Sequence, residues 1–226
     1  MNNANADTPR SEDNERERWN TRFAAGDYVF GTAPNAFLAA QASRLRPGMT
    51  ALCVADGEGR NSVWLARQCL VVTAFDFSTA GLAKARALAA KAGVRVDYRE
   101  SDVAHWSWAS TQYDVVVAIF VQFASPPLRA QMFAGMIEAT KPGGLVIVQG
   151  YGPKQLEYAT GGPKKLENLY TLDLLRESFG ALDIAHLAAH DELITEGAGH
   201  HGMSALIDMV ARKPPPGAAG EGCCRM

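Results

Sequence analysis

The sequence predicts an α/β fold: a doubly wound, seven-stranded, mostly parallel sheet with one antiparallel strand near the C-terminus. Three observations predict it. Short apolar, β-branched runs alternate with helical patterns between about residues 50 and 213, which is typical of a parallel sheet covered by helices on both faces. The first strand runs directly into a glycine loop and a helix. The last two strand patterns are joined by a polar loop without a helix signal, so we expect them to pair as a hairpin.

Five strands are expected from short apolar runs, at 50–55, 70–75, 94–98, 113–120 and 145–150. Helices are expected between them at 59–68, 78–93 and 126–140. Ser78 is a candidate N-cap for the second helix and Gly93 its stop, and two prolines occupy the first turn of the third. The run at 113–120 is apolar throughout, as in a strand that is buried on both faces. A helix at 171–179 and strands at 182–189 and 204–212 complete the pattern.

Length and charge limit the domain organisation and the partners. The 226 residues favour a single domain at 16–213, with an N-terminal lid or cap at 16–45, a disordered tail at 1–15 and a flexible tail at 214–226. The 22 basic and 24 acidic residues give a net charge of −2, which provides no electrostatic footprint for nucleic acid or an anionic membrane. No apolar run approaches a membrane span. We therefore expect a small-molecule substrate, a monomer or homodimer, and a cytoplasmic location.

The four cysteines form no disulfide framework. Cys53 and Cys69 lie in or beside apolar runs and are expected to be buried free thiols, whereas Cys223 and Cys224 are adjacent in the polar tail. The cysteines lack paired CxxC spacing and the histidines are not at helical intervals, so no metal site is predicted. These features agree with a reducing, cytoplasmic compartment.

The glycine loop at 55–60 is the default binding site, because ligands of open parallel sheets bind beyond the carboxyl ends of the strands. Asp76 ends the second strand, where a carboxylate can accept hydrogen bonds from both ribose hydroxyls. The alternative is that Asp76 only caps the next helix. The glycines do not have the G-x-G-x-x-G spacing of a dinucleotide site, because the pattern is Ala55-x-Gly57-x-Gly59.

Asp102 follows the third strand in "ESDV". Its carboxylate could accept from an adenine amino group while the backbone of Val103 reads the ring edge, although a turn-forming aspartate is the simpler alternative. Ribose and adenine sites without a phosphate cradle fit S-adenosylmethionine, which joins an adenosine to an amino-acid tail.

The series "VADGEGRNSVWLA … AFDFS … SDV … DVVVAIF … KPGG" resembles the class I S-adenosylmethionine-dependent methyltransferases over about residues 16–213. The segment at 19–38 and the "GEGRNS" loop are similar to the tellurite-resistance and thiopurine-type branch, which methylates sulfur, selenium or tellurium. The resemblance implies S-adenosylmethionine as the cofactor. The residues expected to bind it are Trp19, Phe30, Ala55, Gly57, Gly59, Asn61, Asp76, Phe77, Asp102, Val103, Ile119 and Phe120.

Two positions depart from the family pattern. Cys53 stands where the family usually has an acidic residue, and Ala55 stands where it has its first loop glycine. Alanine disfavours a positive φ and places a methyl group where the cofactor lies close.

Four aromatic residues precede the first strand: Trp19, Phe23, Tyr28 and Phe30. Some of them are expected to pack the N-terminal segment onto the domain. Trp19 and Phe30 are expected to line the site as a lid, because a sulfonium ion is attracted to aromatic faces and a lid excludes water.

The acceptor side is expected to follow strands four and five. Gln122 and Phe123 come directly after strand four, and a long loop follows strand five. Long loops at the carboxyl edge are often functional. The candidates for substrate binding are Gln122, Phe123, Tyr151, Tyr158 and Tyr170, with ordinary loop packing as the alternative.

These observations predict transfer of a methyl group by in-line displacement to a small soft nucleophile such as a thiol, selenium or tellurium compound. Because such nucleophiles are strong when deprotonated, positioning supplies most of the acceleration and a general base is optional. Arg60, His200 and His201 are the catalytic candidates. One alternative is an O- or N-methyltransferase with His200 or His201 as base. Another is a non-catalytic ligand-sensing or partner-binding domain, which Cys53 and Ala55 would support.

Overall fold

The computed structural model describes residues 12–215, with side chains from residue 15 onward. Its single sheet has seven strands in the order β3-β2-β1-β4-β5-β7-β6, which confirms the predicted fold class. The strands are β1 (Thr50–Val54), β2 (Val71–Asp76), β3 (Val96–Glu100), β4 (Tyr113–Ile119), β5 (Thr140–Tyr151), β6 (Asp183–Thr195) and β7 (His201–Arg212).

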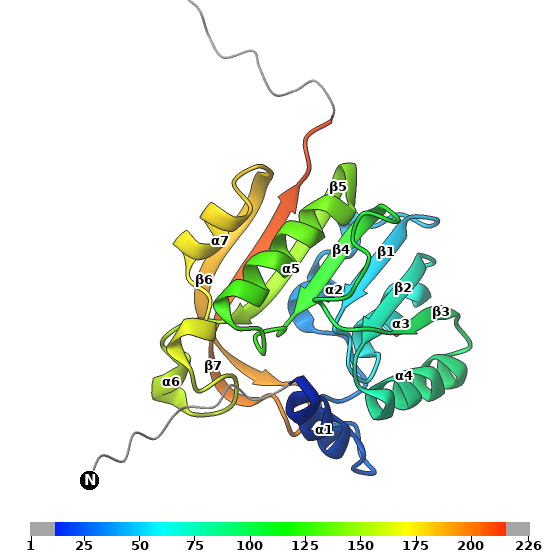
Figure 1. The fold of residues 1–226 in the computed structure, drawn as a ribbon, viewed down its shortest axis with the longest axis vertical. Helices are drawn as coiled ribbons and strands as arrows, with labels where there is room; N and C mark the ends of the chain where they lie inside the picture. The colour runs from blue at the N-terminus through cyan, green and yellow to red at the C-terminus, as the bar shows by residue number, and fades with distance from the viewer. Residues whose placement is uncertain (1–11, 216–226) are drawn as a thin grey trace, which may run out of the picture.

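Strands β1 to β5 pair in parallel, and β7 is antiparallel to both of its neighbours, β5 and β6. This is the antiparallel strand that the sequence predicts. The hairpin pairing runs from Asp183 opposite Arg212 to Thr195 opposite His201. Its tip therefore lies at the same edge as the carboxyl ends of the parallel strands, beside α1 (Figure 1).

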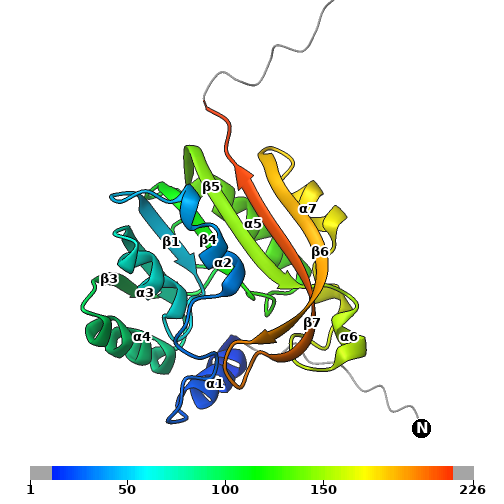
Figure 2. The ribbon, with the colours of Figure 1, turned by 180° about the vertical axis from the view of Figure 1, so that it is seen from behind.

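Two helical layers cover the sheet (Figures 1 and 2). One face carries α2 (Ala36–Ala40), α3 (Arg60–Arg67) and α4 (Thr79–Ala92), and the other carries α5 (Pro126–Ala139) and α7 (Leu172–Ser178). Ser78 caps α4 by accepting from the Gly81 N–H, and Gly93 ends it with φ 68°, as predicted. The two prolines of α5 occupy its first turn.

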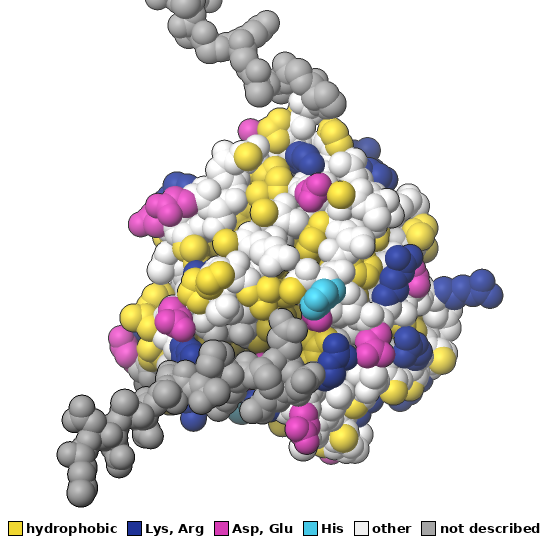
Figure 3. Space-filling model, viewed as in Figure 1, with side chains coloured by type: hydrophobic (Ala, Val, Ile, Leu, Met, Phe, Trp, Pro, Cys, Tyr) yellow, Lys and Arg dark blue, Asp and Glu magenta, His cyan; other side chains and the backbone are white. Residues whose placement is uncertain are grey.

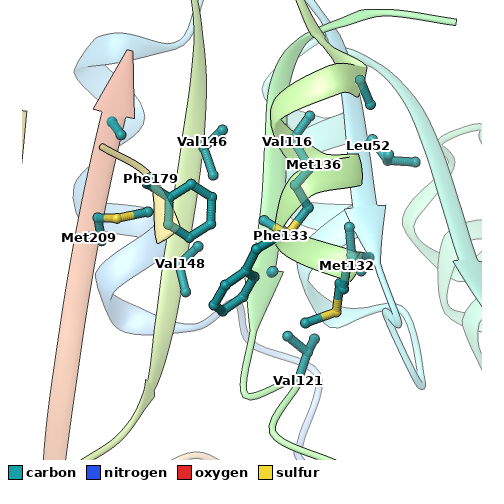
Figure 4. Packing of buried hydrophobic residues seen from close by; sticks show 14 of the residues in the cluster. Leu52, Val116, Val121, Met132, Phe133, Met136, Val146, Val148, Phe179 and Met209 are labelled. Carbon is teal, nitrogen blue, oxygen red and sulfur yellow. The ribbon is translucent and has the colours of Figure 1, made fainter. Parts of the chain in front are cut away.

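The larger core lies between the sheet and α5, where Phe133 and Met136 pack with Phe179 against Val146 and Met209 (Figure 4). Strand β4 contributes to the apolar clusters on both faces of the sheet, through Val116 on one and Val115 on the other. Full burial of a side chain of this kind stabilises the fold by about 1.5–3 kcal/mol. The core thus fixes the strand ends that carry the site.

Several elements differ from the sequence-based expectation. The predicted tail at 1–15 overlaps a helix, α1 (Glu12–Phe23). Its sequence is mostly polar, and Trp19 and Phe23 supply the apolar contact four residues apart. Residues 1–11 lie outside the described part of the chain, as do Cys223, Cys224 and most of the predicted C-terminal tail.

Short helical segments also form that the sequence analysis did not expect. They include η1 (Ala42–Arg44), α6 (Gln155–Tyr158) and η2 (Leu166–Asn168).

Two local predictions were wrong. Cys69 is exposed rather than buried, because it lies in the turn after α3 with φ 63°. Strand β5 begins at Thr140 rather than at the expected residue 145, so it includes the "KPGG" run. This run forms a bulge within β5, where the register jumps between Tyr113 opposite Thr140 and Val115 opposite Leu145. Cys53 is a buried free thiol, as expected.

Charged side chains of both signs are scattered over the face shown in Figure 3. Within residues 12–215, no helix has the length and apolar character needed to cross a membrane.

Candidate active site

The glycine loop has a left-handed backbone conformation at three positions. Ala55, Gly57 and Gly59 have φ values of 47°, 62° and 89°, all in the left-handed region that costs a residue with a Cβ about 1–2 kcal/mol. Ala55 therefore takes the conformation that favours glycine, and it stores strain at the end of β1. At Gly59 a Cβ would lie 2.7 Å from the Cβ of Ala85, so this glycine also permits α3 and α4 to pack closely.

Asp76 lies against this loop. Its carboxylate accepts from the Gly57 N–H at 2.9 Å and from the Ser78 N–H at 2.8 Å. Burial raises the pKa of Asp76 to about 6, although the two N–H donors partly offset this effect. The side chain thus ties the loop to the start of α4. Each oxygen keeps a lone pair for a further donor, such as a ribose hydroxyl.

Asp102 organises its own turn. One of its oxygens accepts from the Ala104 and His105 N–H groups at 2.9 Å, and the His105 ring lies within 3.0 Å of both oxygens. Asp102 therefore has the turn-forming role that the sequence analysis gave as the alternative. A hydrogen bond from an adenine amino group to the Oδ2 atom of Asp102 stays a prediction.

The strands are buried, but the apolar side chains at their carboxyl ends are half-buried. These half-buried side chains are Ala55, Phe77, Ile119, Phe120 and Phe123. Val103 lies buried beside them. Phe120 has φ 56°, so strained backbone occurs at the ends of two neighbouring strands, as is common at functional sites.

Helix α1 covers this edge and is held there by polar contacts. The Asn20 Oδ1 atom accepts from the Ser78 hydroxyl at 2.7 Å and from the Ala80 N–H at 3.2 Å. Arg16 donates to the Phe77 carbonyl at 2.7 Å. The Phe23 ring packs over Gly57, where a Cβ would lie 3.3 Å from its Cζ atom. The anchors of the lid are therefore next to Asp76.

The aromatic residues before β1 divide into two groups. Phe23 is buried, and Tyr28 donates to the Lys84 carbonyl, so both pack the segment onto the domain. Trp19 and Phe30 are half-buried with ring centroids 6.3 Å apart. Glu58 accepts from the Phe30 N–H at 3.3 Å and pairs with Lys84 at 2.9 Å, which fixes Phe30 on the glycine loop.

His200 lies in an aromatic cluster that the tertiary structure assembles. Its ring centroid is 4.3 Å from that of Phe30, 4.2 Å from Phe120 and 5.9 Å from Tyr151. His201 is exposed. Within the described residues, the buried Trp19 Nε1, Tyr151 hydroxyl and His200 Nδ1 atoms have no hydrogen-bond partner. Donors and acceptors remain available here for a ligand.

Glu196 sets the electrostatics of this cluster. Its Oε2 atom lies 2.7 Å from Arg60 Nη1 and 3.9 Å from His200 Nδ1. Burial alone would raise the pKa of Glu196, but His200, Arg60 and the Ala36 N–H outweigh it and hold the pKa at about 2. Burial lowers the pKa of His200 more than Glu196 raises it, so the ring is neutral at pH 7.

The substrate candidates occupy different positions. Tyr151 joins the His200 cluster. The ring centroid of Phe123 lies 5.9 Å from that of Phe77. Gln122 donates to the carbonyls of Tyr151 and Asn168 and accepts from the Tyr151 N–H, so its amide is used within the protein. Tyr170 is fully buried in the core and Tyr158 bonds to Asp191. The structure thus brings Tyr151 to His200 and leaves Tyr158 and Tyr170 elsewhere.

Sequence reasoning missed Asn35, Asp56, Glu58 and Glu196. Asn61, a predicted cofactor residue, accepts from the Asn35 N–H at 3.0 Å. The acidic residues of "ADGEG" were the available signal for Asp56 and Glu58, because a charged side chain in a loop that is buried against the domain needs a partner. Asn35 and Glu196 had no local signal.

Asp56 is an enclosed acid under the loop. Its Oδ2 atom accepts from the Ser62 hydroxyl, which lies 3.0 Å from the Tyr98 hydroxyl, and its Oδ1 atom has no hydrogen-bond partner among the described residues. Burial raises the pKa of Asp56 to about 7; the Ser62 hydrogen bond opposes this effect, and nearby Asp76 adds to it.

Asp56→Asn is expected to change how stability depends on pH. The folded protein keeps the Asp56 proton up to about pH 7, whereas the unfolded chain loses it near pH 4. The wild type therefore loses stability as pH rises between these values. At pH 8 relative to pH 4, Asp56→Asn should gain about 2–4 kcal/mol in the free energy of unfolding over wild type.

Urea unfolding at the two pH values measures this difference. Asp97→Asn makes the same chemical change on an exposed side chain and controls for the loss of one charge. An Asp56→Asn profile parallel to that of the wild type would contradict the assignment.

The site residues fit S-adenosylmethionine. A buried carboxylate beside the glycine loop suits a ribose, half-buried apolar side chains suit an adenine ring, and the faces of Trp19, Phe30 and Phe120 suit a sulfonium. The unpartnered polar atoms next to them suit the amino-acid tail or a substrate.

Comparisons with known proteins agree with this fit. A family described as a methyltransferase domain matches residues 51–144. An uncharacterised protein of Mycobacterium bovis and one of Mycobacterium tuberculosis are each 30% identical over 152 residues, which cover 63% of this chain and 53% of the relative. The chain thus spans about half the length of the curated relatives it matches.

Solved structures share the fold at low identity. One, from work on the conversion of a disulfide bond into a thioacetal group during echinomycin biosynthesis, has a TM-score of 0.72 at 15% identity and covers 90% of this chain and 94% of its own. TehB from Haemophilus influenzae has a TM-score of 0.67 at 19% identity, and the match covers 80% of this chain and 63% of TehB. Magnesium protoporphyrin IX methyltransferase from Synechocystis, with bound SAH, has a TM-score of 0.63 at 16% identity. The match covers 90% of this chain and 95% of that chain. Residues 51–144 therefore match a methyltransferase domain, and the chain shares the fold of these solved structures.

Proposed function

We propose that this protein transfers the methyl group of S-adenosylmethionine to a small soft nucleophile, such as a thiol or a selenium or tellurium anion. When bound, the cofactor supplies an electrophilic methyl group on a positively charged sulfur. The observation that carries the proposal is the meeting of the glycine loop, Asp76 and the Phe30–Phe120–His200 cluster at one edge of the sheet.

The charges around the cluster favour an anionic acceptor. Arg60 is buried at the first turn of α3, where the helix dipole also favours anions. The Arg22 guanidinium lies 4.9 Å from the centroid of the Phe30 ring. Against these two cations, Glu196 is the acid in direct contact with Arg60. A deprotonated thiol or chalcogen in this region needs orientation more than proton removal.

His200 supports a second candidate, an O- or N-methyltransferase. Its buried ring is neutral at pH 7, and its Nδ1 atom has no hydrogen-bond partner among residues 12–215. A neutral imidazole can accept a proton from a hydroxyl or amine. The exposed His201 has a weaker claim to this role.

A panel of acceptors separates the two candidates. Purified protein with S-adenosylmethionine should methylate thiophenol, 2-mercaptoethanol, selenite or tellurite faster than phenol or aniline. Thiol turnover should rise with pH through the pKa of the thiol, because the thiolate is the attacking form.

The second candidate would be favoured if phenol or an amine were methylated faster than every sulfur, selenium or tellurium acceptor in the panel. Its rate should then fall at low pH, and this fall should disappear in His200→Gln. Calorimetry with S-adenosylmethionine and NAD is the matched binding control. Failure to bind S-adenosylmethionine would contradict both candidates and favour a non-catalytic domain.

A further inference from the structure

A line of polar side chains, three of them buried and one half-buried, crosses the sheet behind the site. It consists of Asn35, Gln149, Asp208 and His190, here called the core polar chain. Asn35 Nδ2 donates to Gln149 Oε1 at 2.6 Å, Gln149 Nε2 donates to Asp208 Oδ1 at 2.6 Å, and His190 Nε2 lies 2.8 Å from Asp208 Oδ2. Asn35, Gln149 and Asp208 are at most 5% exposed.

Strand register explains why these side chains meet. Gln149 of β5 pairs directly with Asp208 of β7, and Asp208 pairs with Ala188 of β6, two residues from His190. Residues two apart share a face, so the chain lies on the face of Ile147 and Val210, beneath α2. Replacing a buried polar network by apolar side chains of similar volume is often neutral or stabilising, so stability alone does not explain these residues.

The direction of the hydrogen bonds is fixed at one end. Asn35 Oδ1 caps α2 by accepting from the Leu38 N–H at 3.0 Å, so its Nδ2 must face Gln149. Gln149 must then offer its oxygen to Asn35 and its nitrogen to Asp208. Asp208 Oδ1 accepts from Gln149, and Asp208 Oδ2 pairs with His190 Nε2. The Asn35 and Gln149 amides therefore each have one orientation.

The same Asn35 end of the core polar chain reaches the site. Asn35 Nδ2 also donates to Glu196 Oε1 at 3.0 Å, and the Ala36 N–H donates to the same oxygen at 3.0 Å. These bonds turn the second oxygen of Glu196 toward Arg60 and His200. The backbone N–H of the strained Phe120 donates to the Gln149 carbonyl at 2.8 Å. Glu196 is thus connected to the Gln149 side chain through Asn35, whereas Phe120 is connected only to the Gln149 backbone.

We propose that Gln149 and Asp208 are positioning residues: through Asn35 and Glu196 they hold Arg60 and His200 in the geometry that receives the methyl acceptor. The assignment of Arg60 and His200 to the acceptor half rests on the proposed function. The positioning itself is a property of the folded chain, and it has a readout that does not require turnover.

The double variant Gln149→Met/Asp208→Leu tests the proposal. It removes both partners of the central hydrogen bond; Asn35 Nδ2 keeps Glu196 as an acceptor, and the His190 side chain, which is 36% exposed, can reach water. With thiophenol as acceptor, kcat should fall about tenfold, while the KM and calorimetric Kd of S-adenosylmethionine stay within about twofold, because Asp76 and Gly57 lie outside the chain. Asp208→Asn still accepts from Gln149 and should keep kcat near that of the wild type.

Histidine-selective ¹⁵N NMR supplies the readout without turnover, with the His200 signal assigned by His200→Gln. The double variant should change the ring nitrogen shifts of His200. Asn35→Asp, which keeps the α2 cap but replaces the donor that faces Glu196, should change them as well. It serves as the second variant should the double variant fail to fold.

Unchanged His200 signals and kcat within twofold of the wild type, in a folded double variant or in Asn35→Asp, would overturn the proposal. A wild type that methylates no member of the acceptor panel would instead contradict the proposed function. In that case the His200 signals alone decide whether the core polar chain positions the site.

Discussion

Asp76→Ala is expected to weaken the binding of S-adenosylmethionine by about 10- to 100-fold, or roughly 1–3 kcal/mol. The substitution removes the carboxylate predicted to accept the ribose hydroxyls. It also leaves the Gly57 and Ser78 N–H groups without their acceptor, so the loop itself is expected to loosen. Isothermal titration calorimetry with S-adenosylmethionine measures the effect.

Two variants separate these causes. Asp76→Asn keeps an oxygen acceptor for one backbone N–H and should lose less affinity than Asp76→Ala. Asp102→Ala, at the neighbouring strand end, should have the smaller effect of the two aspartates, since Asp102 spends most of its acceptor capacity on its own turn. Wild-type affinity in a folded Asp76→Ala protein would remove the ribose assignment.

Deletion of residues 1–31 is expected to abolish turnover of the best acceptor in the panel. The deletion removes α1 together with Trp19 and Phe30, and so opens the aromatic cluster to water. Loss of a lid lowers the rate because water then competes for the charged groups of the site. The measurement is kcat at saturating S-adenosylmethionine, accompanied by circular dichroism to confirm that the sheet is folded.

Deletion of residues 1–11 is the matched control and should retain turnover, because Arg16 and Asn20, which anchor the lid, remain in the shortened chain. Trp19→Ala and Phe30→Ala test the same idea without truncation. Each should reduce kcat more than Tyr28→Phe, which removes only the hydrogen bond to Lys84. Equal turnover from the two truncations would contradict the lid.

Much of the fold was predictable from local patterns. The Ser78 cap, the Gly93 stop and the strand runs other than β5 and β6 are found within a few residues of their expected positions, because apolar periodicity and capping act over one or two turns of chain. Strands β5 and β6 are longer than expected by five or six residues at one end. Chain order placed Asp76 beside the glycine loop, because the neighbouring parallel strands β1 and β2 end at the same edge of the sheet. Helix α1 was missed because its stability comes from two aromatic side chains and polar anchors that lie 60 residues or so away in sequence.

The acceptor half of the site was less predictable. His200 was a candidate from its place in the hairpin loop, but its partners were not. Phe30, Phe120 and Tyr151 reach it from three other segments. Tyr158 and Tyr170 had equal claims on sequence grounds, yet burial and a bond to Asp191 take them elsewhere.

By itself, the sequence determined the doubly wound sheet, the hairpin at its end, and the glycine loop followed by Asp76, because these depend on short-range patterns and on chain order. Only the tertiary structure decided that Glu196 pairs with Arg60 and that Asn35, Gln149 and Asp208 join behind them. The physical reason is that a buried polar group must find its partner. That partner is chosen by strand register and helix packing, which no stretch of neighbouring residues specifies.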